Sequence, residues 1–399
     1  MSDASVEDLV TAKPSRRTAL VGLCTTEITS WGVLFYAFPV LAPSITAQTH
    51  WPVSVVAAAF SAGLVVSALV GIPAGRWLDR HGPRGLMSAG SVLGVVAVVA
   101  IALAPTLPVF VAAWLLAGPA MAATFYPPSF AAVTRWYGPD RVKALTALTL
   151  VAGFASTVFA PLAAALDGWL GWRGAYLVLA VVLATVTIPI HLTVLRLPWP
   201  PAPRHDTDAS PSVGAVVVSR GFVALLAAVT LGGFAMYAVV VNQVPLLIAR
   251  GMDATMAAWA LGLGGAGQVA GRLFYSPVLA RVSAVPRTVA VLAAGVATTA
   301  LLALVPGPPV VLVAVAILAG MARGLYTLVQ ATAISDRWGA AAYGRLNGIL
   351  SAPVTIATAI APGAGAVIAT GVGGYPVLFG ILAVVCTAGA IAATLTSPS

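Results

Sequence analysis

Apolar residues fill long blocks of the chain from Thr18 to Leu395, and short clusters of proline, glycine and charged residues separate the blocks. Each block is long enough to cross the hydrocarbon core of a bilayer, which takes about 20 helical residues. Dividing the chain at these clusters predicts twelve helices, at residues 18–46, 51–78, 84–104, 108–135, 140–166, 173–196, 219–249, 254–281, 286–305, 309–336, 342–370 and 375–395. The pattern therefore predicts an all-α integral membrane protein.

Several of these segments approach 30 residues, about half as long again as the shortest span that crosses a bilayer. Excess length of this kind predicts helices that are tilted or bent. Prolines inside the segments are expected to supply the bends, and they are Pro39, Pro127, Pro128, Pro353 and Pro362.

The composition agrees with this fold class. Of the 399 residues, 60% are hydrophobic and 8% are charged, whereas a soluble domain is about 25% charged. So few charges cannot cover a globular surface. Cys24 and Cys386 fall inside predicted helices and are expected to be inert core residues. The first helix is too long for the h-region of a cleavable signal peptide, so none is expected.

Basic residues indicate the orientation of the chain, because cytoplasmic loops carry the excess of Lys and Arg. Sixteen of the twenty fall on one predicted side: Lys13, Arg16, Arg17, Arg76, Arg80, Arg84, Arg135, Arg141, Lys143, Arg196, Arg204, Arg220, Arg281, Arg287, Arg337 and Arg345. Both termini should therefore be cytoplasmic, in a multi-pass protein of the cell membrane. The net charge of +9 is spread over these short loops, which indicates contact with membrane lipid and argues against a nucleic-acid partner.

The two halves of the chain share a plan. VFVAAWLLAG precedes Arg135-Trp136 by the offset that separates VLVAVAILAG from Arg337-Trp338. A shift of about 200 residues also pairs Tyr36 with Tyr237, and Arg80 with Arg281. We predict an N-terminal tail (1–17), a six-helix bundle (18–196), a cytoplasmic linker (197–218), a second pseudo-symmetric six-helix bundle (219–395) and a C-terminal tail (396–399). Two such bundles are typical of a transporter with a central site between them.

The loop GRWLDRHGPRG, residues 75–85, places Asp79 at a helix end beside two arginines. One interpretation is a solvated charged loop. The other is a conformational latch, in which Asp79 pairs with donors of a neighbouring helix end in one state and releases them in the next. The loop resembles the Gly-x-x-x-Asp-Arg-x-Gly-x-Arg motif of the major facilitator superfamily, matched by Gly75, Asp79, Arg80, Gly82 and Arg84. In the second half Ala280 replaces the acid, so the equivalent latch is degenerate.

Within that superfamily the chain looks most like the monocarboxylate-transporter-like branch. The resemblance rests on FYAFPVL (35–41), GWRGAYLVL (171–179) and the arginine of the eighth helix, Arg272. It implies twelve helices, alternating access and carboxylate binding by Arg272. The chain departs from this branch at Val40, where such carriers have a lysine, and at Gln268, where they have an aspartate.

Three charged residues stand out because they fall deep inside predicted helices, away from the helix ends: Glu27, Arg272 and Arg323. A charge in the membrane interior is costly, so such residues usually face a bundle interior or a wet cavity and mark function. Helical spacing places Gln268 on one face with Arg272, and Tyr326 and Gln330 on one face with Arg323. A guanidinium binds a carboxylate with two parallel hydrogen bonds, which suits an organic anion. The alternative for both arginines is a purely structural internal ion pair.

Glu27 is the leading candidate for proton coupling, because burial disfavours the charged form of a carboxyl group. A structural pair between Glu27 and either arginine is the alternative. Tyr36, Tyr237 and Asn242 are further candidates to line a substrate cavity, although such residues often serve only helix packing.

We therefore expect a monomeric secondary transporter that moves a small organic anion, such as a monocarboxylate, with protons or by exchange. A drug or metabolite exporter of the same fold is the alternative. Such exporters usually carry Gly-Pro in the fifth helix, where this chain has Ala160-Pro161. An enzyme is not expected, because metal-binding, nucleophile-elbow and nucleotide-binding motifs are absent from the sequence. No cofactor or metal is expected.

Overall fold

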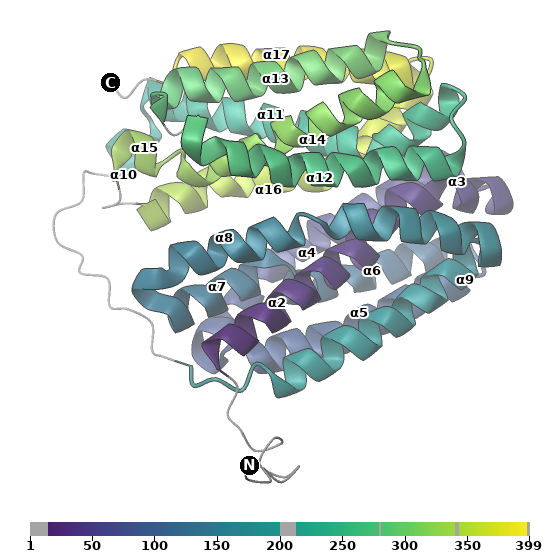
Figure 1. Ribbon diagram of the computed structural model, residues 1–399, viewed down its shortest axis with the longest axis horizontal. Coiled ribbons are helices and arrows are strands. Elements are labelled where there is room, and N and C mark those ends of the chain that lie inside the picture. Colours follow the sequence, from purple (N-terminus) through teal and green to yellow (C-terminus); the bar gives the residue numbers. More distant parts are fainter. Residues whose placement is uncertain (1–14, 200–212, 279–280, 340–342, 397–399) are drawn as a thin grey trace, which may run out of the picture.

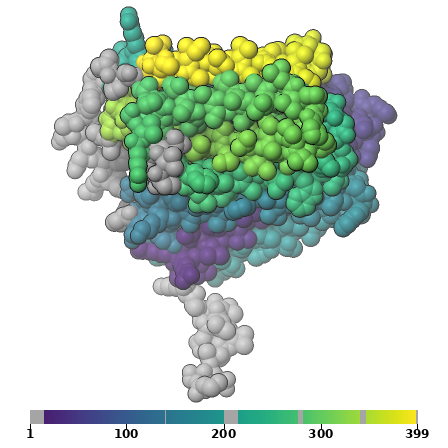
Figure 2. Space-filling model, turned by 45° about the horizontal axis from the view of Figure 1, so that its top comes forward, coloured from purple at the N-terminus to yellow at the C-terminus, as the bar shows by residue number. Residues whose placement is uncertain are grey.

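The computed structural model describes residues 15–199, 213–278, 281–339 and 343–396. Regular structure in these ranges is entirely helical, which confirms the predicted fold class. The helices form two stacked layers, one from each half of the chain (Figure 1). In Figure 2 the C-terminal bundle, green to yellow, lies over the N-terminal bundle, blue to purple.

The N-terminal bundle contains α2 (Arg16–Trp31), the π-helix η1 (Gly32–Tyr36), α3 (Ala37–Thr49), α4 (Val53–His81), α5 (Pro83–Leu103), α6 (Leu107–Thr124), α7 (Tyr126–Tyr137), the 3₁₀ turn η2 (Gly138–Asp140), α8 (Arg141–Ala152) and α9 (Ala155–Thr193). The C-terminal bundle contains α10 (Val213–Val217), α11 (Arg220–Ala249), α12 (Ala254–Val278), α13 (Ala284–Leu304), α14 (Pro309–Thr332), α15 (Ser335–Trp338), α16 (Tyr343–Gly371) and α17 (Tyr375–Thr394). These bounds follow the predicted segments closely.

Ten helical stretches of the described chain are long and apolar enough to cross a membrane. One of them, Arg141–Thr193, contains two spans, because the backbone turns at Gly171, where φ is 68°. The helix α12 is long enough to be a further span, and its glycines, Gln268 and Arg272 make it less apolar than the ten. The described helices thus account for the twelve predicted spans.

Two of the spans bend at predicted prolines. The π-helical turn η1 ends three residues before Pro39, which has no N–H to donate to the carbonyl of Phe35. The backbone of Phe125 is extended between α6 and α7, directly before Tyr126 and the pair Pro127-Pro128. A third interruption, at Gly153 between α8 and α9, was not predicted. All three interruptions fall near the middle of their spans.

A seam of glycines brings α12 and α14 into close contact. We call this the glycine seam, made by Gly264, Gly267 and Gly271 of α12 with Gly320 and Gly324 of α14. A Cβ added at Gly320 would lie 1.9 Å from the Gly264 carbonyl oxygen. The N-terminal bundle repeats this packing, because a Cβ at Gly118 of α6 would lie 2.6 Å from the Gly63 carbonyl oxygen of α4. Matching close approaches at matching positions support the predicted internal repeat.

The two ends of the molecule are distinct. At the linker end, Tyr137 donates to the Arg16 carbonyl, Trp136 to the Pro198 carbonyl and Trp199 to the Asp79 carbonyl. At the far end the chain turns between helices, as at Gly171. In Figure 1 the start of α2 and the short helices α10 and α15 lie toward the linker end.

Candidate functional site

Arg272 lies where the two bundles meet. Its Nη1 donates to the backbone carbonyl of Thr149 in α8, and its Nε lies 3.4 Å from Thr327 Oγ1 of α14. Gly153 leaves room for this guanidinium, because a Cβ there would lie 3.3 Å from Nη1 and 2.7 Å from a Val269 methyl group. The helix interruption at Gly153 therefore positions the Thr149 carbonyl against Arg272.

Arg323 has a different environment. Its Nε and Nη2 donate to Gln268 Oε1 over 3.2 and 3.1 Å, and both residues are buried at 6% exposure. Gln268 therefore faces α14 and Arg323, although its spacing groups it with Arg272 on α12. The glycine seam makes this pairing possible, because a Cβ at Gly324 would lie 2.1 Å from the Gln268 carbonyl oxygen.

Glu27 is completely buried in α2. The Ser129 hydroxyl and the Trp31 indole N–H lie beside its carboxyl group, and both carboxyl oxygens lack a hydrogen-bond partner among the described residues. The ion pairs of the described chain are Arg135–Asp79 and Arg287–Asp336. The structure therefore does not pair Glu27 with Arg272 or Arg323.

Aromatic side chains form a wall in the N-terminal bundle close to Glu27 and Arg272. Trp31 stacks on Phe125 at 4.1 Å between ring centroids and lies 5.2 Å from Tyr126. Across the bundle interface, Phe35 meets Tyr237 of α11 edge-on at 6.4 Å. We call Trp31, Phe35, Tyr36, Phe125 and Tyr126 the aromatic wall.

Tyr126 lies within electrostatic range of both Arg272 and Glu27. It was missed by the sequence analysis, which read Pro127-Pro128 only as a bend. The signal that could have found it is the proline pair itself: a break in the helix directly before Pro127 can turn the side chain of Tyr126 toward the site.

The remaining candidates are distributed unevenly. Tyr36 and Tyr237 are half-buried and lie within electrostatic range of each other. Tyr326 is buried in the C-terminal bundle, where its hydroxyl donates to the Val229 carbonyl over 2.5 Å. Asn242 donates to the Ala238 carbonyl of its own helix over 2.9 Å, and Gln330 is half-buried on α14. The structure thus brings Tyr36 and Tyr237 together with Arg272, and directs Tyr326 away from it.

Hydrogen bonds join the bundles from the far end to the level of Arg272. Thr157 Oγ1 donates to the Gly262 carbonyl over 2.8 Å. The Gly363 N–H donates to Ser61 Oγ over 2.7 Å. Ser61 lies near Val53, where α4 begins at the far end of the molecule, and Gly262 lies near Ala254, where α12 begins at the same end. These two contacts join the bundles on the far side of Arg272, and the bond from Arg272 to Thr149 joins them at Arg272 itself.

The predicted latch contains a partner that the motif does not include. Asp79 Oδ1 pairs with Arg135 Nη2 of α7 at 2.5 Å, and Arg135 also donates to the Asp79 carbonyl. The Trp199 ring lies 4.3 Å from the Arg135 guanidinium carbon. Asp79 is thus bound within its own bundle, to a neighbouring helix end and to the start of the linker.

The other motif residues frame this pair. Gly82 adopts a φ of 81°, which allows the tight turn between α4 and α5. Arg84 Nε donates to the Leu192 carbonyl over 3.0 Å. Arg80 is exposed, and Gly75 has open space around it.

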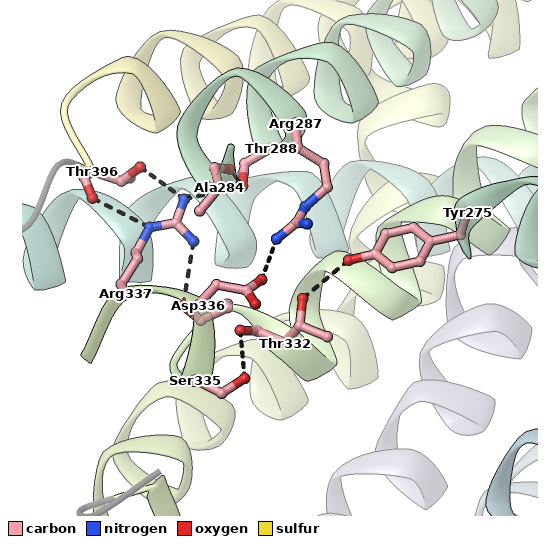
Figure 3. Close-up of polar contacts among 10 residues, drawn as sticks. Tyr275, Ala284, Arg287, Thr288, Thr332, Ser335, Asp336, Arg337 and Thr396 are labelled. Atoms are coloured by element: carbon pink, nitrogen blue, oxygen red, sulfur yellow. Dashed lines mark hydrogen bonds and ion pairs between the residues drawn. The ribbon is translucent and has the colours of Figure 1, made fainter. Parts of the chain in front are cut away.

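In the C-terminal bundle the acid of the equivalent cluster comes from another helix. Arg287 of α13 pairs with Asp336 of α15, directly before Arg337 (Figure 3). Arg337 donates to Thr288 Oγ1 and Thr396 Oγ1 over 3.0 and 2.9 Å. The structure therefore retains an ion pair at this end although Ala280 replaces the motif acid.

Comparison with known proteins identifies the fold. A profile of the major facilitator superfamily matches residues 23–308 and 223–399. A bacterial homologue of the human lysosomal transporter Spinster, in an inward-facing and occupied conformation, is 16% identical with a TM-score of 0.72, over 96% of this chain and 95% of that one. The nucleoside transporter NupG is 13% identical with a TM-score of 0.72, over 95% and 98%. No curated protein matches.

The chain belongs to the major facilitator superfamily. It is a multi-pass membrane transporter that carries a small molecule, and not an enzyme.

Proposed function

We propose that this protein is a secondary transporter of a small organic anion, such as a monocarboxylate, in the monocarboxylate-transporter-like branch of its superfamily. The observation that carries the proposal is the position of Arg272. Its guanidinium lies between the bundles and binds only neutral oxygens of the described chain, those of Thr149 and Thr327. Its positive charge is therefore available to a ligand.

A carboxylate is the ligand that best matches this group. The planar guanidinium can donate two parallel hydrogen bonds to a carboxylate, and such charge-assisted bonds are stronger than those to a neutral carbonyl or hydroxyl. Gln268, which stands where related carriers have an acid, is neutral and bound to Arg323. It therefore does not compete with a substrate for Arg272.

Binding at Arg272 would also loosen the bundle interface. The carbonyl of Thr149 belongs to the N-terminal bundle, and Arg272 belongs to the C-terminal bundle. A substrate carboxylate that takes over Nη1 breaks this contact between the bundles. Substrate binding and bundle movement are then coupled through a single guanidinium, as alternating access requires.

We propose that the linker end is cytoplasmic, on the bias of Lys and Arg described above. With this orientation, the hydrogen bonds of Thr157 and Ser61 between the bundles lie on the outer side of Arg272, so the conformation would be closed to the outside. The protein would act as a monomer in the cell membrane.

Glu27 is the proposed proton carrier. Its carboxyl group is completely buried, has no basic partner among the described residues and shares the neighbourhood of Tyr126 with Arg272. A carboxyl group in such a place favours the neutral, protonated form. A proton bound at Glu27 would accompany the anion, so that the pair crosses the membrane without net charge.

A drug or metabolite exporter is the second candidate, and the aromatic wall is the observation that favours it. The rings of this wall, stacked at Trp31–Phe125 and edge-on to Tyr237 at Phe35, are of the kind that binds a flat apolar molecule. An anion carrier would use the same wall for the apolar part of a small carboxylate. The two candidates differ in whether Arg272 is needed for binding.

The test is ligand stabilisation and vesicle uptake with a panel of monocarboxylates and cationic drugs. Arg272→Ala should abolish binding of the carboxylate that stabilises the wild type most, and Arg272→Lys should restore only part of it, since the bidentate geometry is lost. Arg141→Ala, which removes an exposed arginine, is the matched control and should bind normally. Glu27→Gln should bind the anion but lose the dependence of uptake on a pH gradient.

Drug binding that survives Arg272→Ala, without any carboxylate binding by the wild type, would favour the exporter. A structural pair between Arg272 and Glu27 in another conformation makes a different prediction. Each single variant would then lose thermal stability, and Arg272→Ala combined with Glu27→Gln would regain it. Rescue of this kind would refute the proposed roles.

A further inference from the structure

The C-terminal bundle contains a small cavity away from the bundle interface. Its lining comes from three helices: Met236 and Val239 of α11, Gly295, Thr298 and Thr299 of α13, and Ala319, Ala322 and Arg323 of α14. Its volume of about 10 Å³ for the centre of a water-sized sphere is enough for one water molecule or one ion of similar size. The cavity is too small for an organic substrate.

Arg323 brings a positive charge to this cavity. Its Nε and Nη2 bind the neutral Gln268, whereas Nη1 has no hydrogen-bond partner among the described residues. The two ion pairs of the described chain do not include Arg323. A guanidinium that is only 6% exposed inside a membrane protein needs a counter-charge, because an unpaired buried charge is strongly destabilising.

One hydroxyl group in the cavity lining can donate a hydrogen bond to an anion. Thr298 Oγ1 donates to the Ala294 carbonyl over 2.9 Å, so its proton is already used. Thr299 is buried at 3% exposure, and its hydroxyl makes no hydrogen bond with a described residue. It is therefore free to donate into the cavity beside Arg323.

We propose that the cavity binds a monovalent halide, chloride under physiological conditions, held by Arg323 and Thr299. A cation is excluded by the guanidinium, and the apolar side chains of Met236 and Val239 offer no competing polar groups. The halide neutralises Arg323 and stabilises the packing of α11, α13 and α14. This site goes beyond the proposed function, because the cavity lies within one bundle and Arg272 does not line it.

The test compares thermal unfolding of the purified full-length protein in sodium chloride and in sodium gluconate at equal ionic strength. Chloride should raise the melting temperature of the wild type by about 2–4 °C if it is present at about 100 times its dissociation constant. The shift should vanish in Arg323→Gln and decrease in Thr299→Val. Arg272→Gln, the matched arginine control, should keep it.

A crystal grown in sodium bromide should show an anomalous peak between Arg323 and Thr299, which locates the halide directly in the unmodified protein. This measurement decides the matter if Arg323→Gln fails to fold. Equal melting temperatures in both salts together with no bromide peak would mean that water fills the cavity, and the proposal would be wrong. A chloride shift that persists in Arg323→Gln would also overturn it. Neither outcome affects substrate binding at Arg272, so the two proposals fail separately.

Discussion

The glycine seam positions Gln268, Arg272 and Arg323, so widening it should weaken both the fold and ligand binding. In Gly324→Ala the new Cβ would lie 2.1 Å from the Gln268 carbonyl oxygen, whereas ordinary contacts begin near 3.4 Å. The obstacle is helix backbone and cannot rotate away. The two helices must therefore separate by roughly 1.3 Å, which is the difference between these distances.

The expected magnitudes follow from this separation. Overpacking of this kind typically destabilises a protein by about 1–3 kcal/mol. In enzymes a displacement of about 1 Å of a positioned group can reduce the reaction rate by about 100-fold, and we use this scale as the upper limit for a binding group. We expect Gly324→Ala to lower the melting temperature and to weaken binding of the best carboxylate ligand by a factor between about 10 and 100.

The assay is thermal unfolding in detergent with a ligand titration, carried out on matched alanine variants. Gly380→Ala in α17 is the control, because no atom lies within 4 Å of the added Cβ. It should be neutral or stabilise the protein by about 0.4–1 kcal/mol through the lower entropy of the unfolded chain. If Gly324→Ala matches Gly380→Ala in both stability and affinity, the seam does not position the site.

Two further predictions concern the linker end. Asp79→Asn should slow transport while ligand affinity stays within a few-fold of the wild type, since Asp79 pairs with Arg135 outside the site; Asp140→Asn is the control, and a large loss of affinity with normal transport would contradict the latch. Cysteines at Ser15 and Pro306 should label from opposite sides of the membrane, the former from the cytoplasm, because both native cysteines are buried. Labelling of both from the same side would refute the proposed orientation.

The helices could be predicted from the sequence because the bilayer dictates their length. Bends at Pro39 and Pro127 were also predictable, since proline removes a backbone donor wherever it stands. The interruption at Gly153 was not, because a single glycine in an apolar helix carries no signal of its own. Its cause is tertiary: Arg272 and Val269 of the other bundle occupy the space that a side chain would need.

The site was harder to predict than the helices. Helical spacing identifies residues on one face, but not the helix that the face meets. Gln268 therefore appeared to belong with Arg272, whereas the close approach of α14 directs it to Arg323. Thr149 could not be predicted from the sequence for a different reason. It contributes a backbone carbonyl, which every residue possesses.

The internal repeat separates what the fold needs from what a function needs. Residues required by the fold recur in both halves, as Gly63 and Gly264 do at the close helix contacts. The intramembrane charges do not recur. At the repeat shift of about 200 residues, Glu27 corresponds to Ala228, Arg272 to Gly71 and Arg323 to Met121.

For each of these three charges, the other half of the repeat folds with an uncharged residue at the matching position. Burying a charge is costly. The fold does not require one at these positions, because small or apolar side chains occupy the matching positions of the other half. A charge that the architecture does not require, but that one half nevertheless carries, calls for a role in binding. In the structure Glu27 lies in the N-terminal bundle and Arg272 lies in the C-terminal bundle, so opposite charges are held on the two bodies that the proposed mechanism moves past each other. In the mechanism proposed above, an anion at Arg272 and a proton at Glu27 would complete the charge balance only when both bundles are engaged, and a coupled transporter needs this requirement.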